Sequence, residues 1–266
     1  MDSAVGEVPE YFYKYRPMNS PEMIRRVEQI VLGCEIYFSP PSSFNDPFDL
    51  KPAFSFDASP ERQREDYLRL SRKFQPHYSE SQHSEEADSV MAKTLNAENR
   101  PAAEANVQAL HSFALTSVGV FCVSTKRDDI LMWSHYADSH RGVCLEFNGM
   151  SPLMAHAQQV NYSRKRVAIN PYVDDSMQMM EKAMLTKSEH WTYEGEWRLL
   201  NYTKGSGAVK FRPLNLTGII VGALASRDTS NTVREWAAQR ASPLKIYRAT
   251  ISNKEFEVLI TPHHRA

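Results

Sequence analysis

The chain has 266 residues, of which 42% are apolar and 24% charged, an ordinary composition for a globular protein with one sizeable core or two modest ones. A formal net charge of -1 provides no global attraction to polyanions, so contact with nucleic acid would need a local basic patch. Neither a secretory signal pattern nor an apolar run near the roughly 20 residues of a membrane span is present, so we expect a cytoplasmic protein without a membrane partner.

The first predicted elements are short and have clear ends. Residues 11–16, YFYKYR, are aromatic and alternating and precede Pro17, a pattern that predicts a strand. The SPE at 20–22 supplies an N-cap, a first-turn proline and an early acid to an apolar helical repeat that stops at Gly33. Residues 35–39, EIYFS, predict a second strand, and the SSFNDPFDL that follows shortly after it predicts a turn-rich loop.

The composition then changes from about residue 57 to about residue 112. A Ser-Pro pair at 59–60 predicts the start of a helix, and the later stretch HYSESQHSEEADS is strongly polar. We interpret this segment as a helical insertion within a single domain that spans residues 1–266.

Short strands and helices follow one another in the second half of the chain. A helix capped by Asp128 is expected to carry Trp133, and a methionine-rich helix is expected at 177–185. Gly205-Ser-Gly predicts a hairpin that joins EWRLLNY to AVKFRPL. Strands are expected at 118–124, 143–147, 218–223 and 244–251. The pattern as a whole predicts an α+β fold.

The three cysteines, Cys34, Cys122 and Cys144, are widely spaced and lie in apolar, strand-like contexts. An odd number of cysteines in such contexts predicts buried thiols in a reducing compartment. Because no Cys/His spacing resembles a zinc site, we expect no metal centre.

Two carboxylates stand out in the stretch HWTYEGEWRLL, where Glu194 and Glu196 are two positions apart among aromatic side chains. On a strand, both would project from the same face. One acid could then grip a sugar hydroxyl while the other assists an incoming nucleophile. The alternative is a solvated strand face whose glutamates pair with Arg198 or Lys187.

Other polar residues have both a functional and a structural interpretation. His135 and His140 could bind a metal together with Glu146, could contact a substrate, or could be held in place around core aromatics. Asn45 and Asp46 could touch a ligand or could form a structural Asx-turn. The sequence leaves these alternatives open.

Four fragments, YKYRP, IYFSPPSSFNDPFD, LMWSHYADSHRGVCLEF and HWTYEGEWRLL with a preceding lysine, together resemble the family known as domain of unknown function 2971. They occur in the family's order and span nearly the whole chain. This resemblance indicates a family without naming a reaction.

An arginine that ends the first strand, a serine that ends the second and a late Glu-x-Glu resemble the Arg-Ser-Glu arrangement of ADP-ribosyltransferases. That resemblance implies a mixed, mostly antiparallel split sheet and NAD as substrate. It implies that Glu196 is the catalytic glutamate and that Glu194 prepares the acceptor. Lys14 or Tyr13 also fits the first-strand position. The NAD-binding residues expected on this basis are Arg16, Ser39, Tyr15, Tyr37, Phe44, Asn45, His135 and Tyr136.

The leading hypothesis is therefore an ADP-ribosyltransferase or NAD glycohydrolase that passes ADP-ribose to a protein, a nucleic acid or water. Such an enzyme could be a toxin or effector with an antitoxin or chaperone as partner. One alternative is a non-catalytic nucleotide-sensing or protein-interaction module whose pocket is formed by residues 133–136 and 191–197. A second alternative is a metal-dependent nuclease that uses His135, Glu146 and the two late glutamates.

Overall fold

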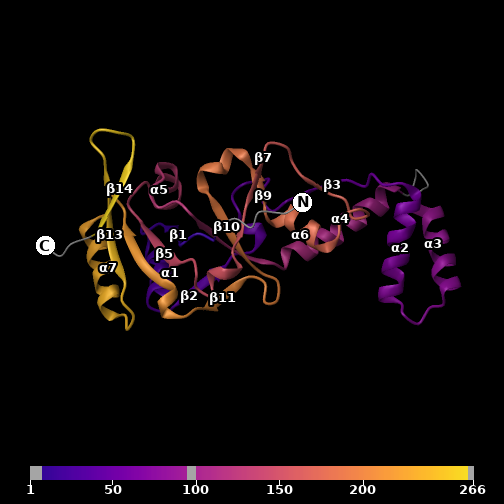
Figure 1. Ribbon diagram of the computed structural model, residues 1–266, viewed down its shortest axis with the longest axis horizontal. Coiled ribbons are helices and arrows are strands. Elements are labelled where there is room, and N and C mark those ends of the chain that lie inside the picture. Colours follow the sequence, from indigo (N-terminus) through magenta and orange to yellow (C-terminus); the bar gives the residue numbers. More distant parts are fainter. Residues whose placement is uncertain (1–7, 95–99, 263–266) are drawn as a thin grey trace. The chain divides into compact units, whose positions relative to one another are not determined.

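A computed structural model describes residues 8–94 and 100–262, which fall into two compact units (Figure 1). The first unit takes its residues from 1–43, 118–162 and 189–266, and the second from 44–117 and 163–188. The chain therefore leaves the first unit twice and returns to it twice.

The first unit contains most of the strands. Its helices are α1 (Pro21–Val31), α5 (Ile130–Tyr136) and α7 (Arg227–Gln239), with the 3-10 turns η1 (Pro41–Ser43), η2 (Met154–His156), η3 (Glu189–Glu194) and η4 (Pro213–Asn215). Its strands are β1 (Tyr11–Arg16), β2 (Glu35–Phe38), β4 (Gly119–Ser124), β5 (Val143–Asn148), β6 (Gln158–Gln159), β10 (Glu196–Asn201), β11 (Gly207–Lys210), β12 (Leu216–Val221), β13 (Lys245–Ile251) and β14 (Val258–Pro262). Strand β7 (Asn161–Ser163) carries the chain into the second unit.

An eight-stranded sheet forms the centre of this unit, in the order β14-β13-β12-β5-β1-β4-β10-β6 (Figure 1). Neighbouring strands are antiparallel except for β12 and β13, which are parallel and are connected through α7. The expected α+β class and the mixed, mostly antiparallel sheet are therefore confirmed. The sheet places β1, β4 and β10 side by side, although β1 and β10 are far apart in the sequence.

Strand β1 pairs very unequally with its two neighbours. Its ladder with β5 runs over all six residues, from Tyr11↔Asn148 to Arg16↔Val143. Its ladder with β4 consists of the single pair Tyr13↔Ser124. The sheet therefore lacks a regular ladder between β1 and β4 on either side of this pair.

Alternation along the strands gives the sheet two apolar faces. Phe12 and Leu145 lie on the face that packs against α1 and α7. Tyr15 and Cys144 lie on the opposite face, where Trp133 of α5 covers them. The full burial of a phenylalanine or leucine side chain such as Phe12 or Leu145 contributes about 1.5–3 kcal/mol to the free energy of folding.

The predicted capping of α1 is confirmed, whereas that of α5 needs a correction. The Ser20 hydroxyl accepts a hydrogen bond from the amide of Met23 at 3.2 Å. Helix α5 is capped by Asp129 and not by Asp128, because the Asp129 carboxylate accepts from the amide of Leu131 at 2.9 Å.

The hairpin expected at Gly205-Ser-Gly is wrong. Strand β11 pairs with β2, in the register Gly207↔Phe38 to Lys210↔Glu35. Strand β10 already pairs with β4 along one edge and with β6 along the other. Because the backbone groups of β10 are already hydrogen-bonded on both edges, β11 cannot pair with β10 and pairs with β2 instead.

The second unit is mainly helical. It contains α2 (Pro60–Phe74), α3 (Glu80–Thr94), α4 (Arg100–Thr116) and α6 (Ser176–Met184), with the short strands β3 (Ala53–Phe54), β8 (Ala168–Ile169) and β9 (Thr186–Ser188). Helices α2 and α3 pack against each other (Figure 1), with an ion pair between Arg64 and Asp88 at 2.7 Å. The segment predicted as a helical insertion thus holds three helices, α2 to α4, and residues 163–188 share their compact unit. Among the described residues, no helix is both long and apolar enough to cross a membrane.

Candidate functional site

A buried ion pair lies on β10. The Arg198 side chain is fully buried and that of Glu196 nearly so. The two residues are two positions apart on a strand and therefore project from the same face. Arg198 donates from Nε to Oε1 of Glu196 at 2.8 Å and from Nη2 to Oε2 at 3.1 Å. This two-point contact fixes the orientation of the Glu196 carboxylate and compensates its charge. The alternative interpretation is therefore confirmed in its pairing of Glu196 with Arg198, but it is wrong about solvent exposure, because both side chains are buried.

Glu194 does not share that strand face, which corrects the sequence-based expectation. It is the last residue of η3, and Gly195 separates it from β10 with a φ of +50°. A glycine adopts this left-handed conformation without the steric cost of a Cβ atom. A Cβ at this position would also lie 2.8 Å from the Thr125 hydroxyl. The turn redirects Glu194, and its carboxylate accepts a hydrogen bond from the Tyr136 hydroxyl at 2.5 Å.

Four residues of α5 and η3, namely His135, Tyr136, Tyr193 and Glu194, form what we call the α5–η3 cluster. Nδ1 of His135 and the Tyr193 hydroxyl are 2.9 Å apart, and the His135 ring packs edge-on against Tyr136. Burial and the nearby Glu194 raise the pKa of Tyr136, so its hydroxyl stays protonated and can donate. His135 is exposed whereas Glu194 is buried, so the cluster connects solvent with a buried carboxylate.

Ser124 connects this cluster to the centre of the sheet. It lies opposite Tyr13 on one side and opposite Glu196 on the other. Its hydroxyl donates to the backbone carbonyl of Glu194 at 2.5 Å and accepts from the amide of Lys126 at 2.9 Å. Sequence reasoning did not single out Ser124; its position at the end of a predicted strand was the available signal.

Lys14 is the first-strand cation that interacts with both glutamates. Its Nζ donates to the backbone carbonyl of Cys122 at 2.6 Å. Burial, followed by repulsion from Arg16, lowers the pKa of Lys14 to about 8, while Glu196 and Glu194 act in the opposite direction. The sequence had offered Lys14 only as an alternative to Arg16.

Arg16 lies in a different electrostatic environment. Burial, and then the charge of Arg26, lowers the pKa of Arg16 to about 10, and Cys122 opposes this shift. The Nε of Arg16 is buried and has no hydrogen-bond partner. An unsatisfied buried donor of this kind is uncommon in folded proteins.

The remaining predicted NAD-binding residues have different environments. Tyr15 is a core residue, because its ring packs edge-on against Trp133 and its hydroxyl donates to the carbonyl of Lys126 at 2.9 Å. Tyr37 on β2 is 54% exposed and therefore offers an accessible ring. Ser39 forms a two-way backbone bridge with Val120, at 2.8 and 2.9 Å.

Phe44 and Asn45 belong to the second unit, where the loop that follows them has a structural turn. The Asp46 carboxylate accepts a hydrogen bond from the amide of Phe48 at 2.8 Å, as an Asx-turn requires. Asp46 is buried and Asn45 is exposed. These contacts support the structural interpretation of Asp46.

The histidines and acids proposed as metal ligands have other partners. His140 faces the Ser134 hydroxyl at 3.2 Å, and Glu146 accepts from the Thr217 hydroxyl at 2.9 Å. Over residues 8–94 and 100–262, no group of three or more His, Cys, Asp or Glu residues is arranged to hold a metal ion.

Comparison with known proteins adds one finding. Residues 132–199 match the family described as Protein of unknown function (DUF2971). The match begins in α5 and ends in β10, so it includes Tyr136, Glu194, Glu196 and Arg198 and leaves out Lys14. The similarity to DUF2971 therefore covers the α5–η3 cluster and the buried ion pair. Neither a curated protein nor a solved structure matched the chain.

Proposed function

We propose that this protein is a cytosolic ADP-ribosyltransferase-like enzyme, acting as a toxin or effector, that cleaves NAD. One observation carries the proposal: two buried carboxylates near the end of one sheet are each held by a dedicated donor. Arg198 holds Glu196, and the Tyr136 hydroxyl holds Glu194. The aromatic ring of Tyr193, also in the α5–η3 cluster, lies beside them in the sequence.

The chemistry requires a fixed negative charge next to the ribose. When the bond between C1′ and the nicotinamide nitrogen breaks, nicotinamide leaves with the electron pair and the sugar becomes oxocarbenium-like. A pre-oriented carboxylate stabilises that developing positive charge without reorganising. We assign this role to Glu196, because Arg198 holds its carboxylate at two points.

Glu194 is assigned to the acceptor. The acceptor nucleophile forms a bond to C1′ and must lose a proton, which Glu194 would take as general base. The hydrogen bond from Tyr136 orients its carboxylate, and the neighbouring His135 and Tyr193 lead to solvent. A protein, a nucleic acid or water could supply the nucleophile.

Arg16 is assigned to the NAD phosphates. A guanidinium has a planar fork of donors that matches a phosphate. The Nε of Arg16 is buried and unpartnered, and a bound phosphate would satisfy it. Alternation along β1 puts Arg16 on the face of Phe12, whereas Glu196 lies opposite Ser124 and Tyr13 on the other face. The assignment therefore requires the phosphates to lie across the sheet from Glu196. Lys14 is less suitable because its ammonium group already donates to the Cys122 carbonyl. The single pair between β1 and β4 supports an opened sheet of the expected type.

The test uses the full chain with NAD labelled in its adenylate phosphate, with and without cell lysate. We expect release of nicotinamide from the wild type, transfer of label if a macromolecule is the acceptor, and a loss of at least about 100-fold in Glu194→Gln and Glu196→Gln. Glu235→Gln, an exposed site on α7, is the matched control and should keep full activity.

Circular dichroism must show that each variant is folded before its activity is compared. Glu196→Gln leaves a buried guanidinium without its anion, so Glu194→Gln and Tyr136→Phe serve as additional tests. Absence of both nicotinamide and label transfer with folded wild-type protein would overturn the proposal. So would a Glu194→Gln variant as active as the Glu235→Gln control.

A further inference from the structure

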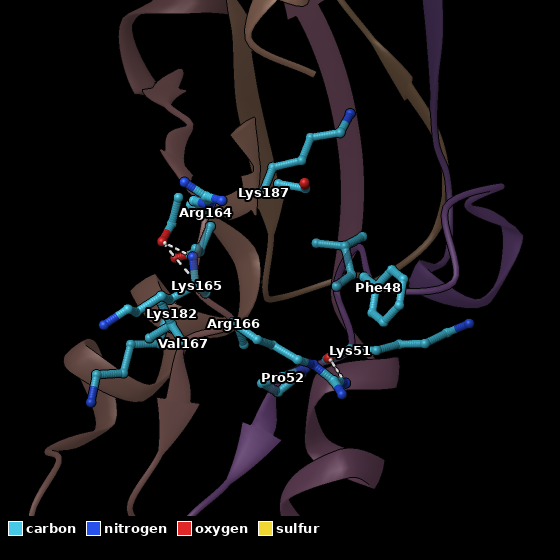
Figure 2. A pocket seen from close by; sticks show the side chains of 14 residues that line it. Phe48, Lys51, Pro52, Arg164, Lys165, Arg166, Val167, Lys182 and Lys187 are labelled. Carbon is cyan, nitrogen blue, oxygen red and sulfur yellow. Dashed lines mark hydrogen bonds between the residues drawn. The ribbon is translucent and has the colours of Figure 1, made fainter. Parts of the chain in front are cut away.

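A pocket of about 220 Å³ lies entirely within the second unit. Its walls come from three segments, around residues 48–52, 163–167 and 182–188 (Figure 2). None of its residues has been assigned to the cleavage of NAD. The role of this pocket therefore needs a separate explanation.

The lining of this pocket is strongly basic. None of the described residues that line it is an aspartate or glutamate. Six of its fourteen residues are cationic, namely Lys51, Arg164, Lys165, Arg166, Lys182 and Lys187. Two of these cations have carboxylate partners outside the lining, since Lys182 lies 2.6 Å from Asp174 and Lys187 lies 3.6 Å from Asp49. A chain with a net charge of -1 has no general surplus of cations. The local concentration therefore indicates an anionic ligand.

An aromatic ring lies at the same pocket. Phe48 is 62% exposed, a large value for a phenylalanine. The Arg166 guanidinium lies 5.6 Å from the centre of its ring, and Arg166 also donates to the backbone carbonyl of Lys51 at 2.8 Å (Figure 2). These two contacts hold Arg166 against the ring. The exposed part of the ring can stack with a flat ligand group.

We propose that this pocket binds a nucleoside phosphate, with the base on Phe48 and the phosphate beside Lys51 and Arg166. Arg166 lies against the Phe48 ring, and the Lys51 amide donates to the Phe48 carbonyl at 3.4 Å (Figure 2). Aromatic stacking combined with cations is the usual way in which proteins hold nucleotide units without reading their sequence. The pocket, at about 220 Å³, is smaller than typical sites for drug-sized ligands, so it leaves no room for a dinucleotide. The nucleotide can be free in solution or part of a single strand. This inference does not rest on the proposed cleavage of NAD.

The test measures binding by calorimetry on the full chain with three probes: adenosine 5′-monophosphate, inorganic phosphate and a short oligothymidylate. Lys51→Glu and Arg166→Gln change exposed side chains, and each should weaken binding of every probe by at least about tenfold. Phe48→Ala should weaken binding of the two nucleotide probes by about fivefold or more and leave phosphate binding unchanged. Lys73→Glu, an exposed site on α2 outside the pocket, is the charge-matched control and should bind like the wild type.

The results distinguish the two possible sources of the nucleotide and test whether the site exists. Tighter binding of the monophosphate identifies a free nucleotide as the source, and tighter binding with a steep salt dependence for the oligonucleotide identifies a strand. Binding that Lys73→Glu weakens as much as Lys51→Glu would show non-specific charge attraction and overturn the proposal. Phosphate binding with no effect of Phe48→Ala on the nucleotides would also overturn it, as would the absence of binding to all three probes. Nicotinamide release is not the readout, so failure here is distinct from failure of the proposed enzyme activity.

Discussion

Replacement of Glu196 by glutamine tests the buried ion pair directly. The substitution keeps the volume of the side chain but removes its charge, while the Arg198 guanidinium stays fully buried. Of the two hydrogen bonds, at 2.8 and 3.1 Å, one would then face an amide nitrogen that cannot accept. Removing one partner of a buried pair costs about 3–5 kcal/mol of unfolding free energy. That is a large part of the roughly 5–15 kcal/mol that stabilises a typical protein.

Urea unfolding followed by tryptophan fluorescence is a suitable assay, because all four tryptophans belong to the first unit: Trp133, Trp191, Trp197 and Trp236. The free energy of unfolding follows from the midpoint and the slope of the transition. The double variant Glu196→Met with Arg198→Met removes both charges together, and it should recover most of the loss. A loss below about 1 kcal/mol in Glu196→Gln, or a double variant less stable than the single one, would refute the reasoning.

Three further results are expected. Because burial lowers the pKa of Lys14 to about 8, the protonated form is disfavoured in the folded state, so stability should rise between pH 8 and about pH 10.4 by up to about 3 kcal/mol. Lys14→Met should abolish that rise in urea titrations across this pH range. Tyr136→Phe removes the 2.5 Å hydrogen bond to Glu194 and should cost about 1.5–3 kcal/mol, measured by the same unfolding assay; no loss would show that the bond contributes nothing. Gly195→Ala should cost about 1–3 kcal/mol in thermal unfolding, because φ is +50° there and the new Cβ would meet Thr125, whereas an unchanged melting temperature would contradict the strain argument.

Elements with strong local signals were predicted well. The strand at Tyr11–Arg16 follows from its alternating aromatic residues and the proline after it. Helix α1 follows from the Ser20 cap and from apolar residues at helical spacing, of which Val27, Ile30 and Val31 are buried. In both cases the decisive interactions lie within a few residues of one another in the sequence.

The errors arose where a local pattern admitted two outcomes. The Glu-x-Glu pattern at 194–196 is typical of a strand. In the structure Gly195 adopts a left-handed conformation that ends this pattern, and an alternating sequence does not reveal such a conformation. The glycines at 205–207 suggested a hairpin, but the partner of β11 depended on which strand edges were already paired. A choice of this kind involves residues far apart in the chain.

The sequence by itself determined the α+β class, most of the strands and the presence of two late glutamates among aromatic residues. Only the tertiary structure decided which donor holds each carboxylate and that Lys14, 108 positions from Cys122, donates to its carbonyl. It also gathered six cations from three separate segments around one pocket. The physical reason is that secondary structure depends on neighbouring residues, whereas hydrogen-bond partners, burial and local charge depend on how distant segments pack.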